Sequence, residues 1–123
     1  MVRAIILVAF GGATGSVFRY LTSIVMNKYF NAIFPIATFT ANFLGCFIIG
    51  LLLGIFEKQQ VTNNDLKFLL VTGFCGGYTT FSTFASENVN LFNSNNSTTA
   101  FVYMAASLLA SLFAVWVGLQ LTK

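Results

Sequence analysis

The chain has 123 residues, of which 57% are hydrophobic and only 7% are charged, and its formal net charge is +3. About a quarter of the residues in a soluble domain are charged, so this chain cannot cover a water-facing surface, and lipid is the solvent that fits it. The basic residues are spread along the chain, whereas nucleic-acid binders cluster them on one face. Histidine, the commonest general base and metal ligand, is absent.

Four apolar stretches are each long enough to cross the hydrocarbon core, which takes about 20 helical residues. Short polar connections join them, and Pro35, the only proline, stands where the second stretch begins, as is common at helix starts. We expect an all-α, multi-pass protein of the cell inner (plasma) membrane, with residues 1–123 forming a single four-helix transmembrane domain. The expected spans are residues 2–26, 33–56, 66–92 and 98–121.

The charges favour one orientation in the membrane only weakly. With four crossings, the N-terminus, the second connection and the C-terminus share one side, which carries four basic residues against two on the other side. The positive-inside rule therefore slightly favours cytoplasmic termini. So small a bias also permits insertion in both directions, which an antiparallel dimer requires.

Small residues recur at the spacing that lets membrane helices approach closely. Three G-x-x-x-G pairs occur, and the last stretch has a stripe of small residues four apart. We interpret most of these residues as helix-packing positions in a compact bundle. They are Gly11 and Gly15, Gly50 and Gly54, Gly73 and Gly77, and the stripe of Ala106, Ala110, Ala114 and Gly118.

Residues 73–84 read GFCGGYTTFSTF, with three glycines and four Ser or Thr residues inside the third stretch. Glycine costs about 1 kcal/mol relative to alanine in a helix interior, so this composition predicts a third helix broken near mid-membrane, unwound over residues 73–80. Backbone groups freed at that depth need neighbours, water or an ion, and half-helix ends can bind ions. The alternative is a helix that is only kinked by its Ser and Thr residues.

Phe81 and Phe84 follow this segment and, being three residues apart, project from one helical face. An aromatic ring has a positive edge, so rings turned edge-on can line the route of a small anion without holding it as a full charge would. The alternative is that both rings face lipid or pack in the core, as most of the 15 phenylalanines would.

Polar side chains mark the second and fourth stretches. Asn42 lies inside the second stretch with Thr38 one turn before it, and Tyr103, Ser107 and Ser111 recur every four residues in the fourth. These groups can replace the water around an anion. Two alternatives remain open: the amide can serve interhelical hydrogen bonding, and the serines can bond carbonyls of their own helix.

Arg19 and Glu87 are the charges placed well inside the spans, where charged groups generally face a bundle interior or a wet cavity. We interpret them as the lining of a wet vestibule at one pore mouth, the alternative being that they pair with each other. Cys46 and Cys75 form no C-x-x-C motif, so we interpret both as small apolar residues.

These residues together resemble the Fluc (CrcB) family of fluoride channels over essentially the whole chain. The resemblance rests on GGATGSVFRY at 11–20, on Thr38-x-x-x-Asn42 followed by Gly45, and above all on residues 73–84. It implies a channel, and not an enzyme, that passively exports fluoride from the cytoplasm. It also implies an antiparallel, dual-topology homodimer in the lipid bilayer, with two pores along the interface of the two copies and no nucleic-acid partner.

The resemblance also implies roles for individual residues. Phe81 and Phe84 match the phenylalanine pair that lines each pore, Asn42 matches the pore asparagine, and Tyr103, Ser107 and Ser111 correspond to the polar track. Backbone carbonyls of Gly76 and Thr79 from both copies would enclose a structural sodium ion at the dimer centre. Arg19, Thr38 and Glu87 correspond to the polar group of the vestibule.

Three other classes of membrane protein fit the sequence less well. A small four-helix, dual-topology multidrug transporter needs a carboxylate in its first span, but residues 2–26 contain none and carry Arg19 instead. A membrane thiol oxidase needs paired, reactive cysteines. A non-conducting structural subunit would leave the composition of residues 73–84 unexplained.

Overall fold

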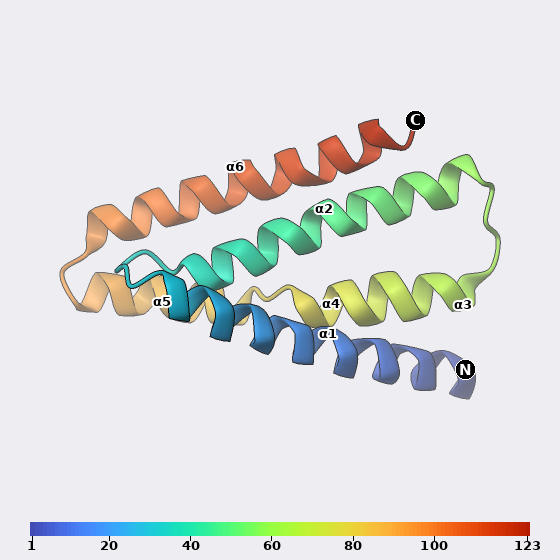
Figure 1. The fold of residues 1–123 in the computed structure, drawn as a ribbon, viewed down its shortest axis with the longest axis horizontal. Helices are drawn as coiled ribbons and strands as arrows, with labels where there is room; N and C mark the ends of the chain where they lie inside the picture. Colours follow the sequence, from blue (N-terminus) through green and yellow to red (C-terminus); the bar gives the residue numbers. More distant parts are fainter.

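The computed structural model describes residues 1–123 and is entirely helical, as predicted (Figure 1). Three of its helices are long and apolar enough to cross a membrane. The third predicted span is divided among several shorter elements. In chain order the elements are α1 (Val2–Tyr29), α2 (Ile36–Lys58), α3 (Asn64–Leu66), the π-helix η1 (Lys67–Cys75), α4 (Gly76–Tyr78), α5 (Ser82–Asn93) and α6 (Ser97–Leu121).

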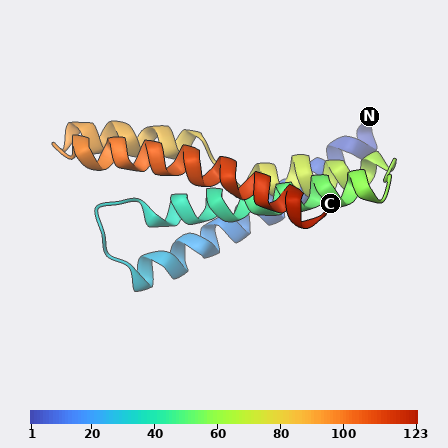
Figure 2. The ribbon, with the colours of Figure 1, turned by 90° about the horizontal axis from the view of Figure 1, so that it is seen from above.

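The helices lie side by side along one long axis. Both termini and the turn between α2 and α3 lie at one end of the molecule (Figure 1). Seen from above, the hairpin of α1 and α2 and the hairpin of α5 and α6 diverge toward the other end (Figure 2). The ribbons therefore spread apart toward that end, where Phe34 and Phe39 fill the space against Tyr103 of α6.

Local signals account for the ends of several elements. Pro35 is the residue immediately before α2, which confirms its predicted place at a helix start. The Asn63 side chain accepts a hydrogen bond of 2.9 Å from the backbone N–H of Asp65 and so caps α3. An ion pair of 2.7 Å between Arg3 and Asp65 then links the first turn of α1 to α3.

Glycines bring α1 into backbone contact with η1 and α4. A Cβ added at Gly11 would overlap the carbonyl oxygen of Leu69, and one added at Gly77 would lie 3.0 Å from the Cα of Gly12. Side chains are thus excluded where these helices cross, which is the close approach that small residues permit in membranes.

Glycines also bring α2 into backbone contact with the second half of α6. A Cβ at Gly118 would lie 2.7 Å from the backbone N of Leu51, and one at Gly50 would lie 3.0 Å from the Cα of Val115. Gly118 and Ala114 are both buried. These contacts agree with the packing interpretation of the small-residue pattern.

The predicted unwinding of residues 73–80 is wrong for residues 73–78, which remain helical in η1 and α4. The physical reason is that Gly73 and Gly77 pack against α1, and no glycine of this segment adopts a positive φ angle. Only residues 79–81, between α4 and α5, leave the helix. We call these three residues the helix break.

Candidate functional site

Two threonines determine how the chain enters and leaves the helix break. Thr79 has an extended backbone with ψ 159°, and both its N–H and its hydroxyl donate to the carbonyl of Cys75, at 3.0 and 2.8 Å. The hydroxyl of Thr80 accepts a hydrogen bond of 3.2 Å from the N–H of Thr83, in the first turn of α5. Side chains of this kind are favoured at helix starts because they satisfy N–H groups that lack a helical partner.

Asn42 of α2 satisfies both backbone polar groups of Thr80. Its side-chain amide donates to the Thr80 carbonyl at 3.0 Å, and its oxygen accepts from the Thr80 N–H at 2.8 Å. A buried amide whose partner is lost costs about 1–3 kcal/mol for each group left unsatisfied. The interhelical hydrogen bonding left open by the sequence is therefore present, and it is directed at the helix break.

The hydrogen bonding leaves the carbonyls of Gly76 and Thr79 without their usual helical donors. Thr80 would donate to Gly76 in a continuous helix, but its N–H is taken by Asn42. Thr83 would donate to Thr79, but its N–H is taken by the Thr80 hydroxyl. Gly76 is also solvent-exposed in a single chain.

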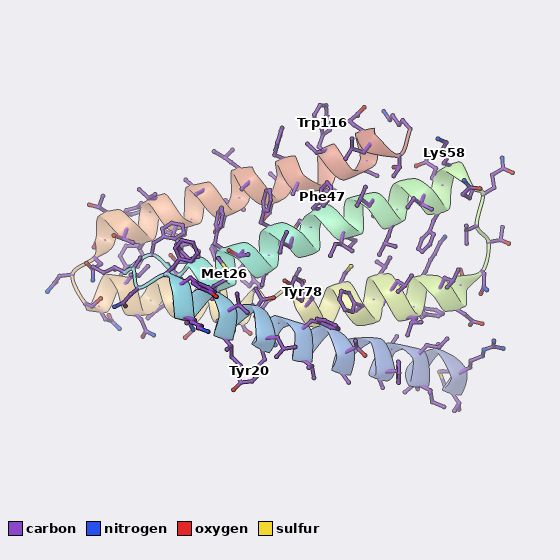
Figure 3. The ribbon with its side chains drawn as sticks, in the orientation of Figure 1. Tyr20, Met26, Phe47, Lys58, Tyr78 and Trp116 are labelled. Carbon is purple, nitrogen blue, oxygen red and sulfur yellow. The ribbon has the colours of Figure 1, made fainter.

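Tyr78 anchors the end of α4 before the helix break. It lies near the centre of the molecule (Figure 3), where its hydroxyl is 2.8 Å from that of Thr22 in α1. Its ring stacks on Phe74 at 5.9 Å and 8°. On the α2 side, a Cβ at Gly45 would overlap the Thr79 side chain and lie 3.2 Å from the Tyr78 ring, so glycine there provides space for both residues.

Glu87 links three helices through its two carboxylate oxygens. Oε2 accepts a hydrogen bond from the Thr38 hydroxyl of α2, and Oε1 accepts one from the Tyr103 hydroxyl of α6, each at 2.9 Å. Both hydroxyl residues are buried. Charge-assisted hydrogen bonds of this type hold a carboxylate in a fixed position within a bundle.

Arg19 does not form an ion pair with Glu87. The chain's only ion pair joins Arg3 to Asp65. Instead Arg19 lines a hollow of about 300 Å³ together with Thr38, Thr80 and Thr83. Glu87 lines a separate hollow of about 280 Å³ near the connection between α5 and α6. The alternative of an Arg19–Glu87 pair is wrong, and Thr38 is the residue that borders the first hollow and bonds to Glu87.

Phe81 and Phe84 lie beside each other at the start of α5, with ring centroids 5.8 Å apart at 45°. The side chain of Phe81 is 78% exposed, whereas Phe84 is half-buried, with its ring 5.0 Å from that of Tyr103. The aromatic pair therefore extends from the interior of the bundle to its surface.

The aromatic pair, the helix break and the polar faces of α2 and α6 surround one space, which we call the central hollow. Its volume is about 270 Å³, it opens to the surface of the chain, and no charged side chain lines it. Thr38 and Tyr103 lie outside it and are joined by Glu87. The lining residues are Asn42, Cys46, Thr79, Thr80, Phe81, Phe84, Ser107, Leu108, Ser111 and Leu112.

Ser107 supplies the central hollow with a hydroxyl group that has no partner. The residue is only 8% exposed, and its Oγ atom makes no hydrogen bond within the chain. It therefore does not bond a carbonyl of its own helix, which was the alternative for this stripe of residues. Buried polar atoms are nearly always paired, so the unpaired hydroxyl of a residue that lines the hollow is a donor that remains available.

Among the lining residues that were not predicted from the sequence, Cys46 is the one that α2 contributes. It was interpreted as a small apolar side chain, but the structure places it in the lining of the central hollow beside Asn42 and Ser111. The available signal was its spacing, since Cys46 follows Asn42 by four residues and so lies on the same face of α2.

The chemistry of the central hollow suits a small anion. Hydroxyl groups and ring edges offer positive poles, while the absence of a basic side chain avoids tight capture. No cluster of three His, Cys, Asp or Glu side chains able to hold a metal ion is present. The free carbonyls at the helix break are neutral oxygens of the kind that can hold a cation.

Comparison with known proteins assigns the chain to a family. The family described as "CrcB-like protein, Camphor Resistance (CrcB)" matches residues 6–119. The chain belongs to the CrcB family. With its three long apolar helices, this CrcB protein is a multi-pass integral protein of the cell membrane.

Several curated relatives match the CrcB chain over nearly its full length. A protein named "Fluoride-specific ion channel FluC" from Flavobacterium psychrophilum is 50% identical over 121 residues, which is 98% of both chains. The protein of the same name from Azobacteroides pseudotrichonymphae is 40% identical over 123 residues, covering 100% of this chain and 98% of its own. "Fluoride-specific ion channel FluC 2" from Rhodococcus jostii is 46% identical over 119 residues, covering 97% and 98% respectively.

Proposed function

We propose that this CrcB protein is a passive fluoride channel that exports fluoride from the cytoplasm, and that the central hollow is part of its conduction path. The observation that carries the proposal is the unpaired, buried hydroxyl of Ser107, a residue that lines an uncharged hollow bordered by Phe81 and Phe84. Relatives with up to 50% identity are named fluoride-specific ion channels, which supports fluoride as the ion.

Fluoride is small and strongly hydrated, so its passage requires donors that replace its water at each step. Ser107 and Ser111 offer hydroxyl groups along α6, and the edges of the Phe81 and Phe84 rings offer weaker positive poles. A fixed cation beside this path would bind the ion too long, because conduction requires that the ion also leaves. Arg19 lies in a different hollow and would act in the vestibule, together with Thr38 and Glu87.

The membrane arrangement that fits this path is one four-helix domain, residues 1–123, whose third helix is broken near mid-membrane at residues 79–81. Non-helical backbone is tolerated at that depth only where protein, water or an ion satisfies it. Asn42 satisfies Thr80, while the carbonyls of Gly76 and Thr79 keep free acceptor positions.

A second, antiparallel copy of the chain would complete the channel. The central hollow opens to the surface of one chain, and Phe81 is 78% exposed beside that opening. A two-fold partner would cover the opening, and the symmetry would give two equivalent pores in each homodimer. The weak charge bias of the chain is compatible with insertion in both orientations.

The free carbonyls of Gly76 and Thr79 fit a sodium ion at the centre of such a dimer, because Na⁺ is bound by unwound backbone carbonyls in other membrane proteins. Gly76 is exposed on the surface of the chain, where the same atoms of a second copy could meet it. Bound sodium would supply positive charge near both pores and join the two helix breaks. The role of the chain is to present these oxygens, which it does by diverting the N–H groups of Thr80 and Thr83 elsewhere.

The test is anion release from liposomes that contain the purified protein, followed with a fluoride-selective electrode and, in parallel, with a chloride electrode. We expect rapid passive release of fluoride and nearly complete retention of chloride. Equal release of both ions, or no fluoride release above that of empty liposomes, would contradict the proposed function.

The aromatic lining is tested separately with Phe81→Ile and Phe84→Ile. Each change keeps an apolar side chain but removes the positive ring edge, so we expect fluoride release to fall at least ten-fold with the dimer intact by size-exclusion chromatography. Phe101→Ile is the matched control, because Phe101 is 63% exposed on α6 and does not line the central hollow. Normal release by both test variants would refute the pore-lining role.

A further inference from the structure

The polar residues of α2 and α6 can be matched in pairs, which we call levels. Each level follows the previous one by four residues on both helices. Thr38 and Tyr103 form the first level, since both donate to Glu87. Asn42 and Ser107 form the second, and both line the central hollow.

Cys46 and Ser111 occupy the third level, and both line the same central hollow. One step further, a Cβ at Gly50 would lie 3.0 Å from the Cα of Val115, so the two helices close on each other there. Between Cys46 and Glu57, α2 carries only apolar residues and glycine. Cys46 is therefore the last polar group of α2 before the helices come into backbone contact.

The two cysteines differ in their surroundings. Cys46 is half-buried and borders the central hollow, whereas Cys75 is buried at 2% exposure and does not. A cysteine in a membrane helix would not by itself indicate a site. The independent observation is Ser107, which lines the same space and whose buried hydroxyl lacks a partner.

We propose that Cys46 is a further lining residue of the anion passage, and that its thiol is a site at which a soft metal ion, Hg²⁺, binds and stops conduction. This inference rests on the proposed function. The S–H group is a weaker donor than a hydroxyl, so it can accompany fluoride to the end of the α2 face while holding it loosely. Mercury would replace the thiol proton to form a sulfur–mercury bond, with the proton released to water, and the bound cation would obstruct the passage and retain the anion.

The experiment measures fluoride release from liposomes before and after addition of mercuric chloride. The variants are the natural chain, Cys75→Ser, Cys46→Ser and Cys46→Ala, each compared with its own untreated rate. We expect mercury to slow release at least ten-fold in the natural chain and in Cys75→Ser, and excess dithiothreitol to restore it. We expect both Cys46 variants to be insensitive to mercury.

Retained sensitivity in the Cys46 variants, its loss in Cys75→Ser, or an insensitive natural chain would each overturn the assignment. Cys46→Ser restores a donor that Cys46→Ala lacks, so untreated Cys46→Ser should conduct several-fold faster than Cys46→Ala, and equal rates would argue against a donor role. If the untreated natural chain releases no fluoride, the proposed function fails. If it releases fluoride but mercury has no effect, only the role of Cys46 fails.

Discussion

Two helix contacts, that of α1 with η1 and α4 and that of α2 with α6, both use glycine but differ in their polar residues. Where α1 crosses η1 and α4, glycines bring backbones together, as at Gly11 and Gly77. Where α2 meets α6, glycine contacts of the same kind close one half, at Gly50 and Gly118, while the other half separates around the central hollow. Small residues thus lie where two membrane helices touch, whereas the half of the α2–α6 contact that carries polar residues four apart borders the central hollow.

The comparison predicts that the α1 contact responds to side-chain volume alone. Gly11→Ala should have the largest effect, because the added Cβ would overlap the carbonyl of Leu69. Overpacking of this kind costs about 1–3 kcal/mol or more, so we expect little folded dimer by size-exclusion chromatography. Gly12→Ala is the matched control, since its Cβ would lie 3.8 Å from the carbonyl oxygen of Gly73, an ordinary van der Waals distance. Equal loss of dimer in both variants would contradict this explanation.

The polar half of the α2 contact should respond to lost hydrogen bonds. Asn42→Ala removes the donor and the acceptor that hold the half-buried Thr80, at no more than about 1–3 kcal/mol for each group left unpaired. We expect fluoride release to fall at least ten-fold. The exposed Asn90 of α5 supplies the control Asn90→Ala, which should conduct normally. Normal release by Asn42→Ala would remove the amide from the passage.

Ser107→Ala separates stability from conduction. Removing a buried hydroxyl that has no partner should leave the free energy of unfolding unchanged or raise it by up to about 1 kcal/mol. The thermal unfolding midpoint should therefore stay the same or rise. Fluoride release should nevertheless fall several-fold, because one donor of the passage is lost. Ser86→Ala, on the exposed side of α5, should change neither quantity. A destabilised Ser107→Ala protein with normal release would show that this hydroxyl is structural.

The smallest effect is expected at the rim of the α1 contact. Arg3→Ala removes the ion pair with Asp65, but the Arg3 side chain is 80% exposed. Exposed pairs contribute about 0–1 kcal/mol, so the unfolding midpoint and fluoride release should hardly change. A large loss of folded protein would mean that this end of the bundle depends on the ion pair more than its exposure indicates.

Much of the fold could be predicted from the sequence because apolar length and the place of Pro35 depend only on local composition. The extent of the helix break could not, because glycine serves both to unwind a helix and to admit a neighbouring backbone, and only the tertiary structure distinguishes the two uses. Residues 73–78 stay helical, and glycines among them admit the backbone of α1. The helix break itself is made by Thr79 and Thr80, whose hydrogen bonds include partners far away in the sequence.

Residue type also limited the prediction of the site. Asn42, Ser107 and Ser111 were predicted because polar groups are rare in membrane spans, and the structure places them around one hollow with Phe81 and Phe84. Cys46 was missed because cysteine was counted as an apolar residue, although Cys46 lies on the same face of α2 as Asn42. The hydrogen bonds of Glu87 to two helices could not be derived from spacing, because they depend on how three helices meet.

The most direct test locates the ion itself. ¹⁹F solid-state NMR of frozen, fluoride-loaded liposomes can detect transfer from the ion to the ring hydrogens of labelled phenylalanine, with Phe84→Ile and Phe101→Ile samples to assign the signal. We predict transfer in the natural chain and in Phe101→Ile, a decrease in Phe84→Ile, and its loss when Phe81→Ile is added to Phe84→Ile. Transfer that persists unchanged when both rings are replaced, or fluoride that contacts no phenylalanine ring, would contradict a passage through the central hollow.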